Sequence, residues 1–481
     1  MRANLTTSAT QRLLVILLIT VIVYLPGLSG SFEFDDYTNI LLNDYIAYAE
    51  LSLHSLAESA WSGGMSGPLK RPISMLSFAF NSATTGIWPM AFKITNLIVH
   101  LCVGIVVFHL AKTLIVATIP SSKNYPNTKG NPTNLALIVA AIWLLHPINL
   151  TSVLYVVQRM TSLSALFTFG ALLAYSVGRL RMIRGLHRGE VLVYCATPVI
   201  ALLGVLSKEN AVLALPLIVV TEACFFRFRA LEDDKRRRFK LVYLVSGLLL
   251  FVGAIALSFW GPGYLDEAYK YRSFSLGERV LTETRVLWFY ISLIFVPRIT
   301  SFALFHDDIV ISTSIIDPFT TVLAVAGIVL LMGVGIIGAK KAPVIGFGLL
   351  WFLVGHALES SFMPLELVHE HRNYLPSFGL IFAATWVIND LLAAENSQQY
   401  RRVVAIVGIF VFGGLTMLRA VSWSDPVTLA TVEAENHPNS MRSLYSAGRA
   451  HYGMYLLTGD ASKLESSRQF LERAAAVDDG A

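Results

Sequence analysis

Long apolar runs recur along almost the whole chain, and they constrain the fold more than any other feature. A helix that spans a bilayer needs roughly 20 mostly apolar residues. Runs of that kind occupy residues 12–29, 92–118, 134–150, 152–177, 191–207, 211–226, 241–260, 315–338, 343–358, 375–394 and 403–422. Because only helices and closed barrels satisfy their backbone inside lipid, the sequence predicts an all-α, polytopic membrane helix bundle with about eleven spans.

Composition excludes the soluble alternatives. Of the 481 residues, 55 % are hydrophobic and only 14 % are charged, which is too much apolar surface for a soluble particle to hide. The three cysteines, Cys102, Cys195 and Cys224, lie in apolar runs and form no CxxC pair. A disulfide scaffold and a structural zinc site on cysteine are therefore excluded.

Basic residues in the short loops predict the orientation. Lysine and arginine gather near residues 2–12, 123–129, 179–188, 227–240, 340–341 and 401–402. The positive-inside bias puts these segments, and with them the N-terminus, in the cytoplasm. This is consistent only if the apolar run 286–297 is re-entrant or interfacial rather than spanning. We therefore expect a multi-pass protein of the inner (plasma) membrane with a periplasmic C-terminus.

The chain divides into two predicted parts. Residues 1–423 form the membrane domain, with a long outer loop at 30–91, and residues 424–481 form a helical, non-cytoplasmic tail. The spacing of Leu444, Gly448 and Phe470 fits the 34-residue tetratricopeptide pattern loosely. One repeat cannot bury its own face. Either the tail packs on the membrane domain, or the chain continues past Ala481, or the tail is a plain two-helix cap.

Two adjacent carboxylates, Asp35 and Asp36, follow the first apolar run. A carboxylate at a membrane surface can act as a general base on a hydroxyl acceptor. It can also bind a metal or stabilise a cationic transition state. The alternative is an acidic cap on a loop helix. We predict a catalytic role for this pair and favour Asp35, which lies nearer the bilayer.

Three further positions carry charge where apolar runs begin or end. Arg71 lies on the outer face, where a basic residue opposes the orientation bias, and its fork suits a phosphate. Arg159 opens a long apolar run, and Lys208 and Glu209 separate two others. Charged groups at such depths are candidates for function. The alternatives are an interfacial anchor, a snorkelling arginine and a polar turn.

The densest polar cluster is His369-Glu370-His371-Arg372-Asn373-Tyr374. Its spacing is not the HExxH of zinc proteases, and no metal site is predicted. Its donors suit an anionic headgroup, so we predict that His369, Glu370, His371, Arg372 and Tyr374, together with His146, help to bind the donor phosphate or the substrate. The alternative is a polar interfacial belt.

Nucleotide-binding and hydrolase motifs are absent from the sequence. It contains no Walker A loop, no GxSxG elbow and no GxGxxG. No cofactor is therefore predicted, and no motif supports a divalent metal. A substrate that is already activated, such as a lipid-linked sugar, requires no nucleotide at the site.

The ordered series of short motifs resembles one family. Phe34-Asp35-Asp36, Arg71-Pro72, Asn96-Leu97 with His100, His146-Pro147 ahead of Arg159, Ser207-Lys208-Glu209 and Glu370 to Tyr374 span about residues 30 to 380. In this order they are similar to the transmembrane and tetratricopeptide-repeat proteins and their bacterial relatives, within the C-type glycosyltransferase superfamily. The sequence departs from the animal members at Gln158, at His-Glu-His and in its single repeat, which leaves sugar and acceptor open.

The resemblance implies a membrane helix bundle with its active site on the non-cytoplasmic face. It implies a polyprenyl-phosphate sugar as donor, a protein hydroxyl as acceptor and an acidic residue of the first outer loop as base. That residue corresponds to Asp35 or Asp36. The tail would then help to engage the acceptor, and nucleic acid is not an expected partner. Two other classes stay open: a lipid-linked glycan ligase or transfer protein, and a non-enzymatic receptor with a docking tail.

Overall fold

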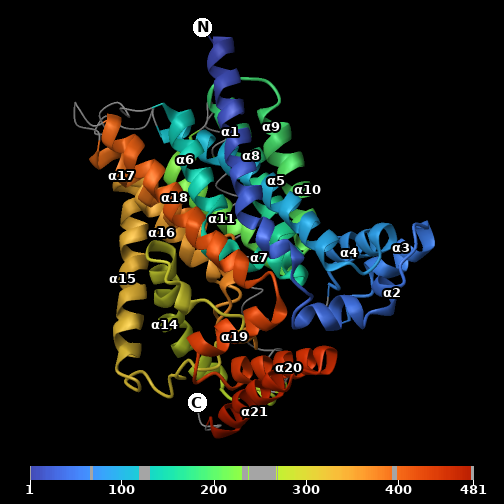
Figure 1. The fold of residues 1–481 in the computed structure, drawn as a ribbon. Helices are drawn as coiled ribbons and strands as arrows, with labels where there is room; N and C mark the ends of the chain where they lie inside the picture. The colour runs from blue at the N-terminus through green and yellow to red at the C-terminus, as the bar shows by residue number, and fades with distance from the viewer. Residues whose placement is uncertain are drawn as a thin grey trace.

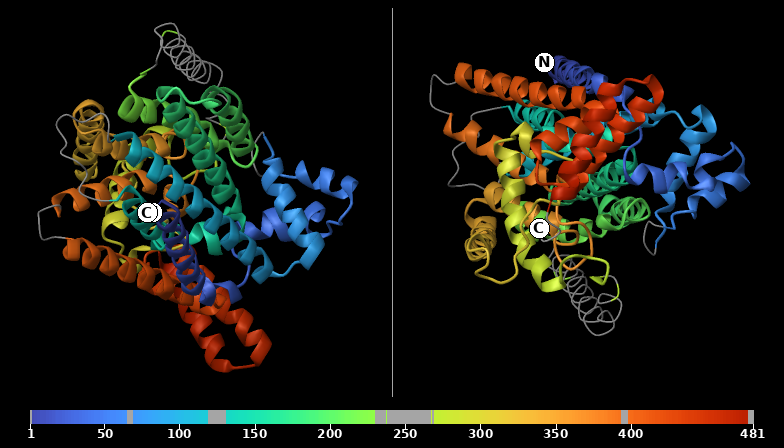
Figure 2. Two further views of the ribbon diagram at one scale, coloured as in Figure 1. Left: turned by 90° about the horizontal axis from the view of Figure 1, so that it is seen from above. Right: turned by 60° about the horizontal axis from the view of Figure 1, so that its bottom comes forward.

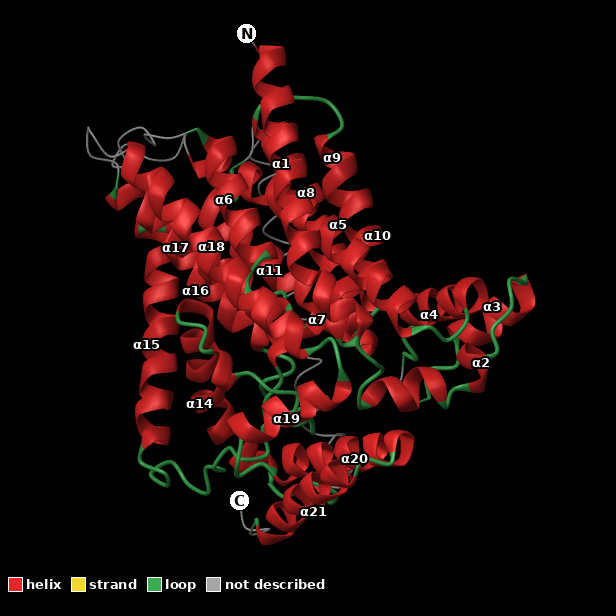
Figure 3. Cartoon of the chain, in the orientation of Figure 1, coloured by secondary structure: helices red, strands yellow, loops and turns green. Residues whose placement is uncertain are grey.

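The chain is helical throughout the part for which the structure, a computed structural model, describes the residues. These are 2–64, 69–118, 131–229, 269–392 and 398–477, with Arg237 and Glu267. No strand occurs within these ranges (Figure 3), so the all-α prediction is confirmed there. The predicted span at 241–260 lies outside the described residues.

The N-terminal half of the bundle contains the helices up to residue 226. Its α-helices are α1 (Arg2–Tyr24), α2 (Asp44–Ala47), α3 (Leu53–Ala60), α4 (Pro72–Thr85), α5 (Pro89–Thr118), α6 (Pro132–Leu144), α7 (Thr151–Leu154), α8 (Arg159–Ile183), α9 (Gly189–Val191), α10 (Thr197–Val205) and α11 (Ala214–Thr221). Short 3₁₀ or π turns connect them, at η1 (Leu25–Ser29), η2 (Tyr37–Leu41), η4 (Pro147–Asn149), η5 (Val156–Gln158), η6 (Leu192–Ala196), η7 (Glu209–Leu213) and η8 (Glu222–Phe226).

The C-terminal half begins after the second long gap in the description. Its helices are α14 (Leu276–Phe295), η9 (Ile299–Ser301), α15 (Thr320–Lys341), α16 (Pro343–His356), η10 (Glu370–Asn373), α17 (Ser377–Leu391), α18 (Gln398–Ser422), α19 (Pro426–Asn436), α20 (Met441–Thr458) and α21 (Ala461–Ala476).

Six described helical segments are long and apolar enough to cross a membrane. They are Ala9–Ser29, Pro89–Thr118, Val156–Ile183, Glu209–Phe226, Thr320–Lys341 and Gln399–Ser422. A seventh is possible because α6 and the helical turn Pro147–Leu154 form a pair bent by 53°. Three shorter apolar helical segments lie among them: Gly189–Val205, Pro343–His356 and Ser377–Leu391. The predicted count of about eleven spans is therefore not confirmed.

Different segments of the chain lie at the two ends of the bundle (Figure 1). The N-terminus and the connection from α8 to α9 lie at one end, and the tail helices α19 to α21 lie at the other. Helices α2 to α4 of the first loop project sideways from the bundle in both views of Figure 2, and Figure 1 shows them in the lower part of the molecule, toward the tail. The chemically varied loops thus share the end that carries the tail.

Helix α14 contains most of the apolar run predicted to be re-entrant, and it is not among the described helices apolar enough to span. Its two flanks meet the same part of the molecule. Before it, Arg272 pairs with Glu366 at 2.9 Å. After it, Ala303 donates its backbone N–H to Glu370 at 2.7 Å. Because both flanks contact the loop between α16 and α17, the chain enters and leaves α14 at one end of the bundle, which favours the re-entrant interpretation.

Glycine allows the closest helix contacts in the C-terminal half. A Cβ at Gly346 on α16 would collide with the backbone of Gly338 and Ala339 on α15. One at Gly348 would meet Ala383 and the carbonyl of Gly379 on α17. Inside lipid the hydrophobic effect does not drive helices together. Small residues let the helix backbones approach closely, and van der Waals contacts then hold the helices together. Helices α15, α16 and α17 are assembled in this way.

The tail forms a small core of its own and is docked on the bundle. Helices α19, α20 and α21 enclose a core of Ala430, Ala434, Leu444, Ala447 and Ala474. Glu433 on α19 accepts the backbone N–H of Leu304 at 2.8 Å. Burial raises the pKa of Glu433 to about 8. The tail therefore packs on the membrane domain, as one of the sequence alternatives required, whereas a tetratricopeptide identity stays a prediction.

An ion pair between α8 and η8 is the most deeply buried one in the described chain. Arg179 donates from two nitrogens to the two oxygens of Glu222, both at 2.8 Å. Tyr175 donates to the same carboxylate at 2.6 Å. Both charged side chains have no exposed surface. Removing one partner of such a pair strands a charge in a medium that cannot solvate it.

We predict that Glu222→Leu lowers the free energy of unfolding by about 3–5 kcal/mol, because Arg179 stays buried without its counter-ion. Denaturant unfolding of the protein in detergent micelles measures this. The double variant Arg179→Met with Glu222→Leu should recover much of the loss. Glu58→Gln, at an exposed pair with His54, is the control and should change stability little. A loss below 1 kcal/mol for Glu222→Leu would contradict the role of the pair.

Candidate functional site

Asp35 and Asp36 lie side by side in the chain but in different surroundings. Asp36 is fully buried, and its two oxygens accept the backbone N–H groups of Glu33 at 2.9 Å and Val157 at 2.6 Å. Burial raises the pKa of Asp36 to about 7, against the lowering effect of these bonds. Asp36 thus ties the first loop to η5 and has no oxygen left unbonded to turn toward a substrate.

Asp35 is only half-buried. Its backbone N–H donates to the Tyr155 hydroxyl at 2.9 Å, and that hydroxyl hydrogen-bonds the Asp35 carboxylate. Burial raises the pKa of Asp35, while Tyr155 and Arg442 of the tail oppose the rise. A half-buried carboxylate with a raised pKa is suited to general-base work.

The backbone holds Asp35 in place through an uncommon conformation. Phe34, the residue before it, has a φ of 35°, in the left-handed region that L side chains rarely adopt. Its ring packs edge-on against Phe305 at 5.2 Å. Arg442 lies over both rings, 5.0 and 4.5 Å from their centroids. The tail and the loop after α14 therefore both contact the residue next to Asp35.

Lys70 and Arg71 are held in the same left-handed conformation, with φ of 55° and 49°. Two consecutive non-glycine residues in this region store strain of about 1–3 kcal/mol each, which is common at ligand sites. Arg71 pairs with Glu209 at 2.9 Å, contacts the Met160 sulfur at 3.3 Å and keeps 23 % of its side chain exposed. Lys70 is exposed. These two residues present cations at the site.

Lys208 forms the second charged pair of the 207–210 turn. It contacts Glu359 at 2.7 Å and the Thr161 hydroxyl at 3.0 Å. Burial raises the pKa of Glu359, but Lys208 and Arg372 outweigh it and bring the pKa down to about 2. The first loop, the 207–210 turn and the loop after α16 thus meet through two ion pairs, Arg71–Glu209 and Lys208–Glu359.

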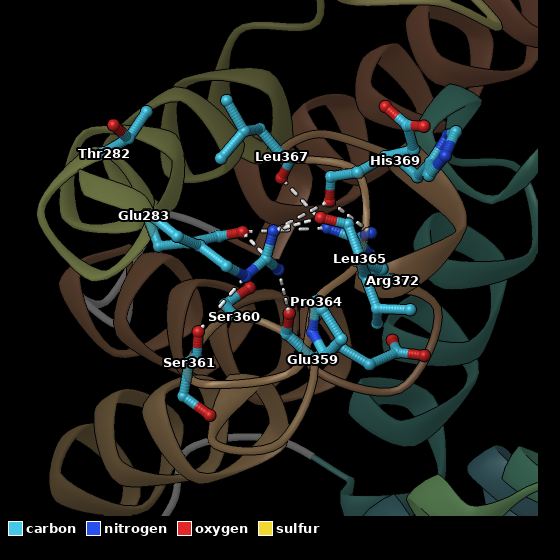
Figure 4. A network of polar contacts seen from close by, with 12 residues as sticks. Thr282, Glu283, Glu359, Ser360, Ser361, Pro364, Leu365, Leu367, His369 and Arg372 are labelled. Atoms are coloured by element: carbon cyan, nitrogen blue, oxygen red, sulfur yellow. Dashed lines mark hydrogen bonds and ion pairs between the residues drawn. The ribbon is translucent and has the colours of Figure 1, made fainter. Parts of the chain in front are cut away.

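Arg372 belongs to a network that builds the loop between α16 and η10 (Figure 4). Its guanidinium donates to the carbonyls of Leu367 at 2.9 Å and Glu366 at 2.6 Å and lies 3.8 Å from Glu283. Arg279 on α14 pairs with Glu283 at 2.8 Å and donates to the carbonyls of Glu359, Ser361, Leu365 and Glu366. Both arginines are buried and act on backbone, so Arg372 shapes the loop and its predicted phosphate role is untested.

The other predicted site residues of the 369–374 cluster also make contacts within the fold. The rings of His369 and His371 stack at 5.0 Å, and burial depresses the pKa of both. Glu370 is bonded to Ala303 and faces Arg419 at 3.5 Å. Tyr374 turns into the bundle, where its hydroxyl meets His100 at 2.7 Å. Arg372 adds to the lowering of the pKa of both histidines, and Lys208 adds to that of His371.

Arg159 and His146 lie inside the bundle. Arg159 donates to Asn96 at 2.6 Å and to the carbonyls of Ser77 and Phe92 at 2.9 Å each. Through these hydrogen bonds Arg159, on α8, is linked to α4 and α5. One ring nitrogen of His146 meets the carbonyl of Ile294 at 2.9 Å. Both side chains are fully buried, so binding a substrate would require exchanging these bonds.

An apolar groove of about 750 Å³ lies along α4, the helix that follows Arg71 in the chain. It runs between α3, α4 and the start of α5, and its surface is mostly apolar although five of its twelve lining residues are polar: Leu56, Ile73, Leu76, Ser77, Phe80, Asn81, Thr84, Thr85, Trp88, Ala91, Ile94 and Thr95. Several of these side chains, such as Phe80 and Trp88, are exposed. The groove is open to the surroundings of the bundle and can accept an extended apolar chain.

Sequence reasoning missed four residues that the fold brings to this site: Tyr155, Glu359, Glu366 and Arg442. Tyr155 stands in an apolar stretch and looks like core, and the two glutamates flank an apolar-rich segment without any motif. Arg442 lies in the tail, where the sequence pattern indicated only helix packing. A charged residue at the edge of an apolar run was the available signal for Glu359, since the same reasoning had selected Lys208.

Among the described side chains that could hold a metal ion, three gather at one place: His306, Asp308 and His437. They belong to the loop after α14 and to the end of α19. None of them was selected from the sequence, because they come from segments about 130 positions apart and follow no ligand spacing.

The chain is similar to proteins named as transferases. It is 21 % identical to a protein O-mannosyl-transferase of Caenorhabditis elegans (F38B6.6) over 467 residues, which cover 94 % of this chain and 61 % of the worm protein. It is 27 % identical to the protein O-mannosyl-transferase Tmtc1 of Drosophila melanogaster over 201 residues, 41 % of this chain and 21 % of the fly protein. The chain spans about three-fifths of the worm relative's length. No protein-family model and no solved structure matches it.

These observations support a polytopic membrane protein that resembles protein O-mannosyl-transferases at low identity. The predicted family resemblance is thereby supported in its general form. The bacterial origin and the repeat character of the tail are not confirmed.

We predict that Asp36→Asn lowers the free energy of unfolding by about 1–3 kcal/mol, because the amide NH₂ cannot accept the backbone N–H that one Asp36 oxygen accepts now. A raised pKa in the folded state also makes Asp36 favour folding at low pH, a contribution that is lost as pH rises from the ordinary value of 3.8 through about 7. Asp36→Asn should remove this slope. Unfolding in detergent between pH 5 and 8 tests both effects, with Asp35→Asn as the control; equal stability of the two variants would refute the assignment.

Proposed function

We propose that the chain is an integral membrane glycosyltransferase that moves a sugar from a polyprenyl-phosphate donor to a protein hydroxyl on the non-cytoplasmic side. The observation that carries this proposal is the similarity to a protein O-mannosyl-transferase along 94 % of the chain. The polar residues at the tail end of the bundle supply groups that such a transfer needs.

Asp35 is the proposed general base. The acceptor hydroxyl gives its proton to the Asp35 carboxylate while its oxygen forms a bond to the anomeric carbon of the sugar. The bond between that carbon and the phosphate oxygen breaks, and its electron pair stays with the lipid phosphate. Asp35 suits this step because it is only half-buried, whereas Asp36 is fully buried with both oxygens bonded to backbone.

Lys70 and Arg71 are the proposed contacts of the donor phosphate, with Lys208 close by. Both lie in the left-handed backbone region, Lys70 is exposed, and Arg71 keeps 23 % of its side chain exposed. The groove along α4 suits the polyprenyl chain, since its surface is mostly apolar and open. Arg71 contacts Met160, and Asp35 contacts Tyr155. Both groups thus contact the segment 155–160, so the proposed base and the proposed phosphate contact share one support.

We predict that Asp35→Asn lowers the transfer rate at least a hundredfold, since general-base catalysis contributes typically about 10²–10⁴-fold. The assay follows mannose from a polyprenyl-phosphate donor to peptide with protein purified in detergent, because the relatives are named mannosyl-transferases. Asp44→Asn, exposed in the same loop, is the matched control and should keep full activity. Near-full activity of Asp35→Asn would reject the base and make Glu209 or Glu370 the next candidate.

We predict that Arg71→Ala weakens donor use by about 10- to 150-fold, because a contact to a charged group is worth roughly 1.5–3 kcal/mol. The effect should fall on the KM for the donor rather than on that for the peptide. Arg468→Ala, at an exposed ion pair of the tail, is the control. An unchanged donor KM would move the phosphate away from Arg71 and reopen the question of Arg372.

If a deletion strain accumulates lipid-linked glycan while its glycoproteins stay unchanged, the chain acts on lipid carriers and not on protein. If replacing both Asp35 and Asp36 leaves every glycan unchanged, the receptor hypothesis replaces the enzyme.

A further inference from the structure

We propose that His306, Asp308 and His437 form a binding site for a divalent transition-metal ion, with Zn²⁺ as the best fit. One ligand atom from each residue lies within 4.8 Å of the others. His306 and His437 are 7 % and 8 % exposed, and Asp308 is half-buried. The two imidazole rings meet edge to face at 5.1 Å. The group joins the loop after α14 to the end of α19.

An unsatisfied nitrogen at this place points to a ligand. His437 uses Nδ1 to contact the Asp308 Oδ2 atom at 2.8 Å. Its Nε2 atom is buried and has no hydrogen-bond partner within the described part of the chain. A buried polar atom without a partner costs about 1–3 kcal/mol. Because the Asp308 carboxylate only accepts, Nδ1 carries the hydrogen and Nε2 keeps a lone pair, and a metal ion bound to Nε2 removes that cost.

The tautomer of His306 is suited to metal binding. Its Nε2 atom lies 3.3 Å from the Glu370 Oε1 atom. A carboxylate only accepts, so Nε2 carries the hydrogen and Nδ1 keeps a lone pair for the metal. Metal-binding histidines commonly donate their other ring N–H to a carboxylate in this way. Glu370 is itself held by the backbone N–H of Ala303 at 2.7 Å, so it orients the ring.

The donor set selects the metal. Two imidazoles and one carboxylate suit zinc and its first-row neighbours, whereas Ca²⁺ and Mg²⁺ prefer oxygen alone. Zinc bonds of about 2.0–2.2 Å require ligand atoms closer together than 4.8 Å, so binding draws the three side chains together. Three protein ligands leave a fourth position for water.

The location gives the ion a structural task. The neighbours of His306 in the chain already contact the tail. The backbone N–H of Leu304 donates to Glu433. Asp307 accepts from the Ser440 hydroxyl and from the backbone N–H of Arg442. Phe305 packs on Phe34, next to Asp35. An ion at this place therefore fastens the tail and the loop after α14 together, beside the candidate base. The site stands whether or not the chain is a transferase.

The test measures metal content and not activity. The full chain, purified in detergent without a metal-binding tag and stripped with a chelator, is dialysed against ZnCl₂ and then analysed by atomic emission. We expect one zinc per chain and a higher unfolding temperature with zinc. His437→Gln and Asp308→Asn should lose both, and His54→Gln, which replaces an exposed histidine far from the group, should keep both.

Two further readouts keep the test decisive. Glu370→Gln should weaken zinc binding by about 10- to 100-fold, as loss of an outer carboxylate does elsewhere. Co²⁺ bound in place of zinc should show the visible absorption of a tetrahedral site, and His306→Gln should abolish it. Zinc retained equally by the ligand variants and the wild type, or no zinc retained by the wild type, would overturn the site. If His437→Gln does not fold, the half-buried Asp308→Asn decides.

Discussion

The buried guanidinium of Arg279 holds together the loop on which the rest of the candidate site depends. It bonds to the carbonyls of Glu359, Ser361, Leu365 and Glu366 and pairs with Glu283 on its own helix. A loop at a membrane boundary has few neighbours to satisfy its backbone, and a buried carbonyl without a donor is costly. By donating hydrogen bonds to those carbonyls, the Arg279 side chain fixes the path of the loop after α16. That loop contains Glu359, Glu366 and residues 369–374.

The cations of this protein divide into two groups with different physical roles. Arg159, Arg279 and Arg372 are buried, and their donors are directed at carbonyls or amides of the fold. Lys70, Arg71 and Arg442 keep part of their surface open. A guanidinium that already satisfies the backbone could bind a substrate phosphate only by giving up those bonds, so open cations are the better candidates for a ligand that comes and goes.

Docking of the tail links the end of the chain to the first loop. Glu433, His437 and Arg442 contact the loop after α14, and Arg442 also lies over Phe34. The surroundings of Asp35 are therefore completed by a segment about 400 positions away in the sequence. A carboxylate with a raised pKa needs such enclosure, because burial is the first cause of that rise.

The sequence by itself determined that the chain is helical and apolar enough to enter a membrane, because apolar runs are local properties. It also predicted that the chemically varied residues gather in the loops of one side of the membrane, because charge placement is local too. It also singled out Asp35, Arg71 and Lys208, since charges at the edges of apolar runs are visible without a fold. Only the tertiary structure decided which charges are open. Asp36 looks like Asp35 in sequence, yet backbone N–H groups of Glu33 and Val157 take its two oxygens. Likewise His306 and His437 meet only because the tail folds back, and no local pattern encodes a contact between such distant segments.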